Sequence, residues 1–303
     1  MDSLAPLIAA ALNAGTPLML AALGLLINEK AGVVNLGAEG MMLVAAVVGF
    51  AVAVDSGSAT LGFLAGAGAG MLLAAFFAWM TVWLGTNQIA TGLALALFGA
   101  GASTYIGIDY AGQSIGNGGH AVPWLAELPV LGAALFRQHP VVYLALLLCV
   151  AIAWFLQRTR AGLVLRAVGE SPWSAHAIGL PVRPIRLAAI VFGGACCGLA
   201  GAYMSLVYTP LWAEGMVGGR GWIALALINF ATWRPLRVAG GAYLFGGVTI
   251  LSFHAQALNV DVASQLLSML PYIAAIVVLV LISRKPNHIK PHLPASLGKD
   301  FRP

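Results

Sequence analysis

The sequence predicts an all-α polytopic membrane protein with about nine transmembrane helices, within a range of roughly eight to ten. Three observations support this prediction. Hydrophobic residues make up 60% of the chain and charged residues only 8%, whereas roughly a quarter of the residues in a soluble domain are charged. The mean hydropathy is +0.92. The 37 glycines have no collagen-like period and fall inside apolar runs, where small residues let membrane helices approach closely.

A stretch that crosses the hydrocarbon needs about 20 apolar residues. On this rule we expect spans at residues 4–27, 32–54, 59–84, 87–107, 140–157, 186–209, 217–233, 238–257 and 263–283. The seventh of these is short. A re-entrant segment within 108–139 is an open alternative, because residues 122–136 are apolar but contain Pro123 and Pro129.

Basic residues orient the predicted spans, because lysine and arginine accumulate in the cytoplasmic loops of membrane proteins. Four clusters fall on one side if the spans alternate: Lys30, loop 158–185, Arg234 with Arg237, and a tail with Arg284, Lys285 and Lys290. The alternation makes loop 158–185 and the C-terminus cytoplasmic and places the N-terminus outside. The net charge of +5 then reflects membrane orientation and does not indicate nucleic-acid binding.

The second span begins with the polar segment NEKAGVVNLGAEGMM, residues 28–42. Carboxylates and amides inside a bilayer usually face a bundle interior or an aqueous cavity. Asn35 and Glu39 are four residues apart, which places them on one face of a helix. The density of glycines also suggests a helix that starts late or is locally unwound, as in transporter cores. Glu39 could therefore line a substrate pathway or stabilise a helix break.

Three further amides border or enter the predicted spans. Asn87 and Gln88 lie where the fourth span begins, and Asn229 is the one amide within the seventh. Together with Asn35 and Glu39, they are our candidates for lining the pathway. Asn87 has a simpler alternative role as the N-cap of the fourth span.

Glycines at four-residue spacing mark two helix faces. Gly62, Gly66 and Gly70 share a face of the third span, and Gly194 and Gly198 share a face of the sixth. Such faces bring helix backbones into contact. Close packing without a direct transport role is the favoured interpretation.

A polar segment, residues 157–186, separates the fifth and sixth spans. Glu170, Ser171 and Pro172 supply a helix-start signal, residues 175–178 form a helix body, and Gly179 ends it before Pro181. A short helix hung between two spans is suited to docking a cytoplasmic partner. The alternative is a plain positively charged loop. Five arginines lie in this segment: Arg158, Arg160, Arg166, Arg183 and Arg186.

Motifs for catalysis and cofactor binding are absent from the sequence. It has no phosphate loop, no H-E-x-x-H zinc pair and no G-x-S-x-G elbow. Cys149, Cys196 and Cys197 lie inside apolar runs, where cysteine acts as a small packing residue. We therefore expect no catalytic residue, no metal site, no cofactor and no ATPase activity in the chain itself.

Four ordered blocks resemble permease subunits of bacterial ABC importers, in the branch that includes branched-chain amino acid and simple-sugar permeases. The blocks are NEKAGVVNLGAEGMMLVAA (28–46), TNQIATGLAL (86–95), LRAVGESPWSAHAIGL (165–180) and GRGWIALALINFATWRPLRVAGGAYLFGG (219–247). The form NEKAGVVNLGAEG most resembles permeases of nucleoside importers that work with a lipoprotein-type binding protein.

The resemblance implies an ABC importer permease fold in a bacterial inner membrane. Residues 1–285 would form a single transmembrane permease domain with coupling loop 158–185, and 286–303 a cytoplasmic tail. The implied partners are a second permease subunit (commonly a heterodimer), two ABC ATPase subunits or one tandem ATPase chain, an extracytoplasmic substrate-binding lipoprotein, and membrane lipid. The coupling residues implied by position are Glu170, Ser171, Pro172, Trp173, Ala175, His176, Ile178 and Gly179. Trp173 and His176 are bulkier than the residues usual in the family pattern.

The resemblance implies an ATP-driven importer permease, with nucleosides as the favoured substrate and purine nucleosides first among them. The alternatives are a simple-sugar (ribose-like) ABC permease and an ion-coupled secondary transporter, for which Glu39 is the one acidic residue in mid-span. An intramembrane enzyme would need catalytic groups that face each other. Glu39 and His254 are the deepest candidates for such a pair, and the predicted topology places them toward opposite faces of the membrane.

Overall fold

We examined a computed structural model of the chain. It describes residues 4–116, 137–257 and 293–301, together with isolated helical positions between 266 and 280. The ninth expected span, the possible re-entrant segment, and the tail positions Arg284, Lys285 and Lys290 lie wholly or mainly outside the described residues. Within the described residues the chain is helical, and the one β-type pairing is an isolated bridge between Ser114 and Leu211.

Ten α-helices follow one another along the described chain. They are α1 (Leu4–Lys30), α2 (Ala38–Ser56), α3 (Ala59–Ala78), α4 (Gln88–Gly107), α6 (Pro140–Arg158), α7 (Arg160–Glu170), α8 (Pro172–Ala177), α9 (Val182–Tyr203), α10 (Arg220–Phe230) and α11 (Pro235–Ala257). Three of them are extended by other helical turns: α3 by the π-helical turn η1 (Trp79–Trp83), α4 by the 3-10 turn η2 (Ile108–Tyr110) and α9 by the π-helical turn η4 (Met204–Tyr208).

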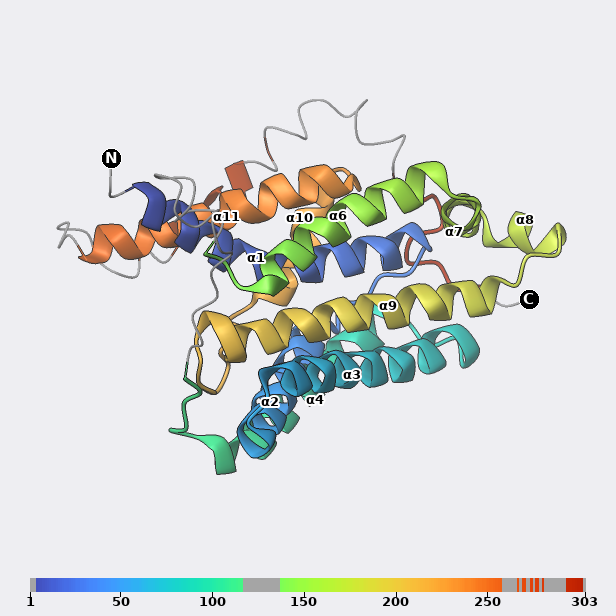
Figure 1. Cartoon of the computed structure of the whole chain (residues 1–303). Coiled ribbons are helices and arrows are strands. Elements are labelled where there is room, and N and C mark those ends of the chain that lie inside the picture. The colour runs from blue at the N-terminus through green and yellow to red at the C-terminus, as the bar shows by residue number, and fades with distance from the viewer. Residues whose placement is uncertain are drawn as a thin grey trace.

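The long helices run side by side around α1, which is buried over residues 14–30 and packs against α9, α10 and α11. In Figure 1, α6 and α11 lie on one side of α1, and α9 with α3 lie on the other. Helices α2 and α4 pack together in the same layer as α3. Neighbouring helices of the bundle therefore include segments that are far apart in the sequence.

Helices α3 and α9 meet along the predicted glycine faces. A Cβ atom added at Gly70 would lie 2.2 Å from the Gly194 carbonyl oxygen, and one added at Gly198 would lie 2.4 Å from that of Gly66. Real side chains do not approach so closely, so the two backbones are in direct contact here. The prediction that these glycines serve close packing is confirmed, and we call this contact the glycine seam.

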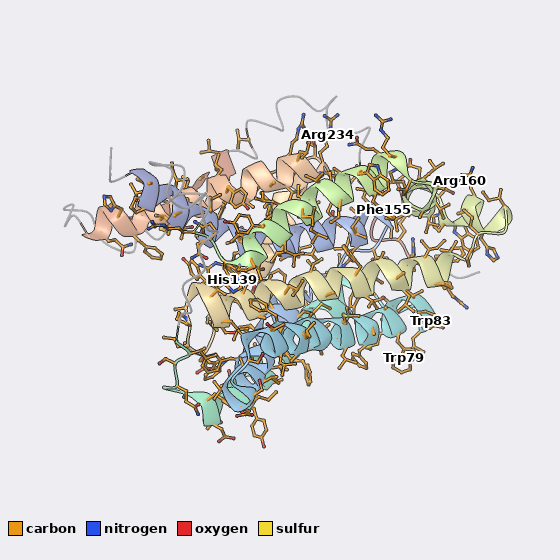
Figure 2. All side chains as sticks on the ribbon, viewed as in Figure 1. Trp79, Trp83, His139, Phe155, Arg160 and Arg234 are labelled. Atoms are coloured by element: carbon orange, nitrogen blue, oxygen red, sulfur yellow. The ribbon has the colours of Figure 1, made fainter. Side chains whose placement is uncertain are left out.

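One end of the bundle is rich in basic residues, and we call it the basic end. Helices α7 and α8 project from the bundle there, and the described C-terminal residues lie beside them (Figure 1). Lys30, at the end of α1, belongs to the same end, since the chain directly after it contacts Gly169 of α7. In Figure 2, Trp79 and Trp83 lie on η1, which continues α3 toward the basic end, and His139 lies toward the opposite end.

Seven helices of the described chain are long and apolar enough to cross a membrane: α1, α2, α3 with η1, α4 with η2, α6, α9 with η4, and α11. The expected seventh span, 217–233, is instead the 11-residue helix α10. At 1.5 Å per residue it covers about 16 Å, roughly half of the hydrocarbon thickness. The expectation that this span is short is confirmed, and its helix is shorter than the predicted range because residues 217–219 and 231–233 lie outside it.

Candidate functional site

Two membrane crossings begin with a non-helical stretch, here called a break, that leads into a helix start inside the bundle. Residues 31–37 separate α1 from α2, and residues 209–219 separate η4 from α10. Helix α2 begins beside the middle of α4, because Gly40 packs directly on the backbone of Leu95 and Ala96. That contact lies about two turns inside α4. The expectation that the second span starts late is confirmed.

The second break approaches from the opposite end of the bundle. Leu211 pairs with Ser114, Trp212 packs on Gly107 at the end of α4, and the Thr104 hydroxyl donates to Glu214 one turn deeper. From there α10 runs toward the basic end, where the Trp233 indole N–H donates to the Glu29 carboxylate at 2.6 Å. The crossing is therefore completed by a non-helical stretch plus a half-length helix.

The Glu39 carboxylate joins the two helix starts. Its Oε1 accepts the backbone N–H of Gly219 at 2.8 Å, and its Oε2 accepts that of Gly221 at 2.7 Å. The first N–H groups of any helix lack partners within the helix, and the helix dipole favours a negative group beside them. Glu39 lies in the first turn of α2, so one buried carboxylate is shared by α2 and α10.

Glycine is needed at this junction for two reasons. Gly219 has a φ of +81°, in the left-handed region that other residues rarely adopt. At Gly221 a Cβ atom would lie 2.5 Å from the backbone nitrogen of Glu39. The two helix starts can approach each other because neither position carries a side chain.

Asn35 stabilises the first break from within. Its Oδ1 accepts the backbone N–H of Gly37 at 3.0 Å, and its Nδ2 points to the sulfur of Met41 at 3.7 Å. Asn35 is fully buried and lies before the first residue of α2. The expectation that Asn35 and Glu39 share a helix face is therefore wrong, because no helix exists at residue 35.

Gln88 and Asn87 also serve local structure. Gln88 is buried; its Oε1 accepts the Val34 N–H at 2.9 Å, and its Nε2 donates to the Lys299 carbonyl oxygen at 3.4 Å. Asn87 is the N-cap of α4 and accepts the Ala90 N–H at 3.0 Å. The structure therefore shows Asn87 in its alternative role, as a helix N-cap.

Asn229 is the pathway candidate with an exposed side chain on a half-helix. Its Nδ2 donates to the carbonyl oxygen of Leu225 one turn earlier. Trp222 lies seven residues before it and is 37% exposed. Residues seven apart lie on the same side of a helix, so α10 presents an indole ring and an amide along one side.

At the basic end, the signals in the sequence produce the predicted short helix. Ser171 is the N-cap of α8 and accepts the Ser174 N–H at 3.2 Å, Pro172 is in the first turn, and Gly179 has a φ of +86°. Helix α7 before it was not predicted; Thr159 caps it by accepting the Gly162 N–H at 3.0 Å. Together α7 and α8 form a bent arm.

The predicted coupling residues divide into two groups on this arm. Pro172 and Ala175 are buried. Trp173 and Ile178 are 56% and 76% exposed, so α8 presents an apolar surface outward. The remaining predicted positions, Glu170, His176 and Gly179, are exposed and Ser171 is half-buried.

Arg186 is an important residue that the sequence reasoning treated only as one basic loop residue. It is 3% exposed, and its Nε donates to the Ala31 carbonyl oxygen at 3.2 Å. Its two other nitrogens point to Lys299 O and Ser296 Oγ, both at 3.5 Å. The sequence position of Arg186 could have indicated this role. It lies where the apolar part of the sixth span begins, and a buried arginine at such a place requires hydrogen-bond partners.

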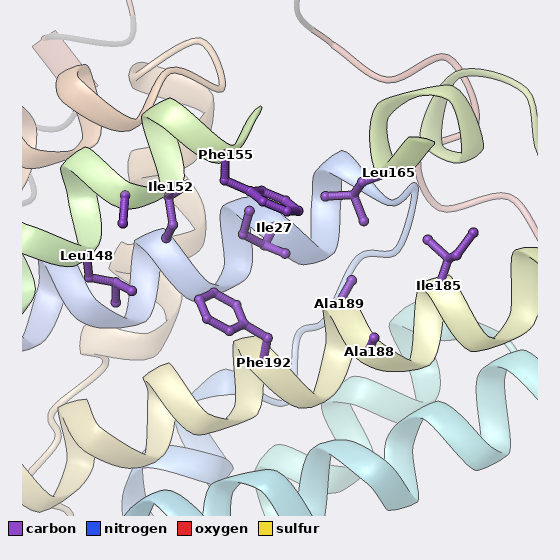
Figure 3. A pocket seen from close by; sticks show the side chains of 10 residues that line it. Ile27, Leu148, Ile152, Phe155, Leu165, Ile185, Ala188, Ala189 and Phe192 are labelled. Carbon is purple, nitrogen blue, oxygen red and sulfur yellow. The ribbon is translucent and has the colours of Figure 1, made fainter. Parts of the chain in front are cut away.

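An apolar cavity near the arm does not suit a polar substrate. It has a volume of about 340 Å³ and lies between α1, α6, α7 and α9 (Figure 3). All ten lining residues are apolar, among them Ile27, Phe155, Leu165 and Phe192. A second cavity of about 450 Å³, between α10 and α11, has Arg237 as its one polar lining residue. No cluster of three potential metal ligands occurs among the described residues.

A half-length helix that starts inside a bundle, with an arm at one end, is typical of a membrane transport subunit. The comparison with known families agrees. The family model for the permease component of branched-chain amino acid transport systems matches residues 7–282. The chain belongs to this family of ABC transporter permeases. Its members are transport subunits that act with separate ATPase and substrate-binding partners, and they carry no ATPase site of their own.

Three curated relatives match over almost their full lengths. The chain is 40% identical to a putative glucose ABC transporter permease of Haloferax volcanii, over 99% of this chain and 98% of the relative. It is 30% identical to a nucleoside ABC transporter permease of Lactococcus lactis (93% of both chains) and to a guanosine ABC transporter permease of Bacillus subtilis (90% of both). No solved structure matches the chain significantly.

Proposed function

We propose that the chain is one of two permease subunits of an ATP-driven importer for a small polyhydroxylated substrate, and that α8 is the element on which an ATPase docks. The observation that carries the proposal is the position of α8. It is a capped helix with an apolar outer surface, held beyond the bundle at the end where the break before α2 begins. In this proposal the basic end is cytoplasmic, following the distribution of basic residues.

The proposed mechanism is alternating access driven by the partners. A loaded binding protein docks at the end opposite the arm, ATP closes the paired ATPases (two subunits or one tandem chain), and α8 transmits the closure to the bundle. Because a ligand shifts an equilibrium only through its differential affinity for the two states, the permease itself needs only weak substrate binding. The second permease subunit would complete the pathway, as a heterodimer in our preferred arrangement.

The pathway candidates take different roles in this proposal. Asn229, with Trp222 on the same side of α10, is proposed to line the path, because an aromatic face and an amide suit a sugar ring. Glu39 and Asn35 are proposed to hold the helix breaks, and Asn87 and Gln88 to hold their cytoplasmic border. Their hydrogen bonds to backbone groups support these positioning roles.

Two substrate classes remain as proposals. The relative with 40% identity, a putative glucose permease, supports a simple sugar. The two relatives with 30% identity support a nucleoside. Uptake of labelled glucose, ribose and guanosine by the complete importer, each competed by the other two, separates these classes. Uptake of labelled guanosine that neither sugar competes with supports the nucleoside prediction. Uptake of labelled glucose or ribose that guanosine does not compete with supports the sugar alternative.

Docking on α8 is tested by replacing its exposed apolar surface while keeping the helix. The double variant Trp173→Glu/Ile178→Glu should insert in the membrane but lose its ATPase during purification. The matched control is Leu163→Glu, because Leu163 is 60% exposed on the neighbouring helix α7. Equal ATPase retention by the double variant and the wild type would overturn the docking proposal. Uptake that follows an ion gradient without any ATPase would favour the secondary-transporter alternative.

A further inference from the structure

The C-terminal segment 293–301, which we call the strap, lies against both the arm and the first helix break. On the arm, the Ser296 N–H and hydroxyl both donate to the Gly169 carbonyl oxygen, at 3.1 and 2.6 Å. The Ala295 N–H donates to the Glu170 carboxylate at 3.4 Å. The strap therefore follows the junction of α7 and α8.

Phe301 anchors the strap under α8. Its ring packs edge-on against Trp173 at 4.9 Å between centroids and lies 5.7 Å from the ring of His176. Phe301 is buried in a small apolar cluster with Val168, Ala175 and Val182. The cluster is separate from the main core, so the strap is part of the structure that supports α8.

The other contacts of the strap lead to the break before α2. The Gly298 N–H donates to the Gly32 carbonyl oxygen at 3.2 Å. The Lys299 carbonyl oxygen accepts from Gln88, whose Oε1 accepts the Val34 N–H. At the basic end, residues 31–37 are thus held by the strap and by the side chain of Gln88, which the strap binds.

Arg186 fixes the strap to the bundle at the same place. Its guanidinium contacts Ala31 of the break and Ser296 and Lys299 of the strap. A buried guanidinium requires hydrogen-bond partners, and acceptors on the break and the strap supply them to Arg186. The planar guanidinium can address three acceptors at once, which a lysine ammonium on a flexible stem does less well.

We propose that the strap, positioned by Arg186, is the mechanical link through which movement of α8 reaches the break before α2. The inference rests on the proposed docking of an ATPase on α8. Because the strap binds α8 through Phe301 and the break through Gly298 and Lys299, displacement of α8 pulls residues 31–37 with it. These residues lead directly to Asn35 and Glu39, which hold the starts of α2 and α10. Arg186 is a positioning residue in this scheme.

The first test compares Arg186→Gln with Arg183→Gln in the complete importer. Arg183 lies on the same helix, carries the same charge and has no hydrogen bond to the strap among the described contacts. The readout is substrate taken up per ATP hydrolysed, measured together with ATPase retention. We expect Arg186→Gln to retain its ATPase and to lose about tenfold in this ratio, a size typical of coupling between sites. Arg183→Gln should stay near the wild type, and Arg186→Lys should recover part of the ratio.

An unchanged ratio in Arg186→Gln overturns the proposal, as does a parallel loss from Arg183→Gln. If the wild type itself retains no ATPase, the docking proposal fails, and this inference fails with it for that separate reason. A second measurement uses the wild-type importer alone, so it does not depend on the folding of a variant. Hydrogen exchange is compared between the nucleotide-free complex and the complex trapped with ATP and vanadate. We expect protection to change together at 169–179, at Ser296 and Gly298, and at 31–37; a change at 31–37 without one at Ser296 and Gly298 overturns the link.

Discussion

Glu39 and Gly221 are 182 residues apart in the sequence and are joined by a 2.7 Å hydrogen bond from the Gly221 N–H to Glu39 Oε2. This bond ties the start of the long helix α2 to the start of the half-length helix α10, whose preceding stretch enters from the opposite end. The carboxylate replaces the intrahelical partners that the N–H groups at the start of α10 lack.

The first prediction concerns the charge of this carboxylate. Glu39→Gln keeps one acceptor oxygen but turns the other acceptor into an N–H₂ donor that opposes a backbone N–H. We expect a loss of about 1–3 kcal/mol in the free energy of unfolding, the usual effect of leaving a buried donor unpaired, with a fall in uptake. Thermal unfolding in detergent measures the first effect. The control is Glu214→Gln, because Glu214 is exposed and lies in the stretch that leads to Gly219. Equal effects of the two variants would contradict the role of Glu39 as the partner of the α10 N–H groups.

The second prediction concerns the space at the junction. In Gly221→Ala, the new methyl group would lie 2.5 Å from the Glu39 nitrogen, so the two helix starts must separate. We expect destabilisation of about 1–3 kcal/mol from overpacking. Gly240→Ala is matched to it, because a Cβ atom there meets nothing within 4 Å. Equal unfolding temperatures for the two variants would show that the helix starts do not touch.

A third prediction compares two glycines on α3. Gly70→Ala places a methyl group 2.2 Å from the Gly194 carbonyl oxygen, whereas Gly68→Ala meets nothing within 4 Å. Alanine is a better helix former than glycine by about 1 kcal/mol. We therefore expect Gly68→Ala to be neutral or slightly stabilising and Gly70→Ala to be destabilising, as measured by thermal unfolding. Effects of the same sign would argue against the glycine seam.

The fourth prediction concerns the contact between Trp233 and Glu29 at the basic end. Trp233→Phe keeps an aromatic ring but removes the N–H that donates to Glu29 at 2.6 Å. Since Glu29 is 4% exposed, we expect a loss of about 1–3 kcal/mol of stability from the unpaired carboxylate. Glu29→Gln retains an acceptor oxygen for the indole and should cost less. The ranking of the two unfolding temperatures checks this, and the reverse order would contradict it.

Features encoded in short stretches of the sequence could be predicted. Ser171, Pro172 and Gly179 specify both ends of α8 through backbone preferences of their own. The glycine spacing in α3 predicts its packing face, because the helical repeat alone determines which residues share a face. The late start of α2 follows from the glycines around residue 37.

The rest depends on contacts between distant segments. Nothing in the sequence near Glu39 indicates that Gly219 and Gly221 would be its partners, since only the tertiary fold brings α10 beside α2. Asn35 was misplaced because a helical repeat was applied to a stretch that is not helical. Arg186 was interpreted as a charge for orientation, although its acceptors at Ala31, Ser296 and Lys299 lie more than a hundred residues away.

The glycine seam determines which surface of the molecule must move. Contacts between side chains can relax by changing rotamers, but two backbones in direct contact have no rotamers to change. Helix α9, which carries Arg186 near its start, can therefore shift only if α3 shifts with it. The outer side of α3 bears Leu64, Leu72 and Phe76, each at least half exposed. In the proposed mechanism, a shift of α9 would therefore displace whatever covers that side, lipid or a second permease, and this displacement would add its own resistance to the transport rate.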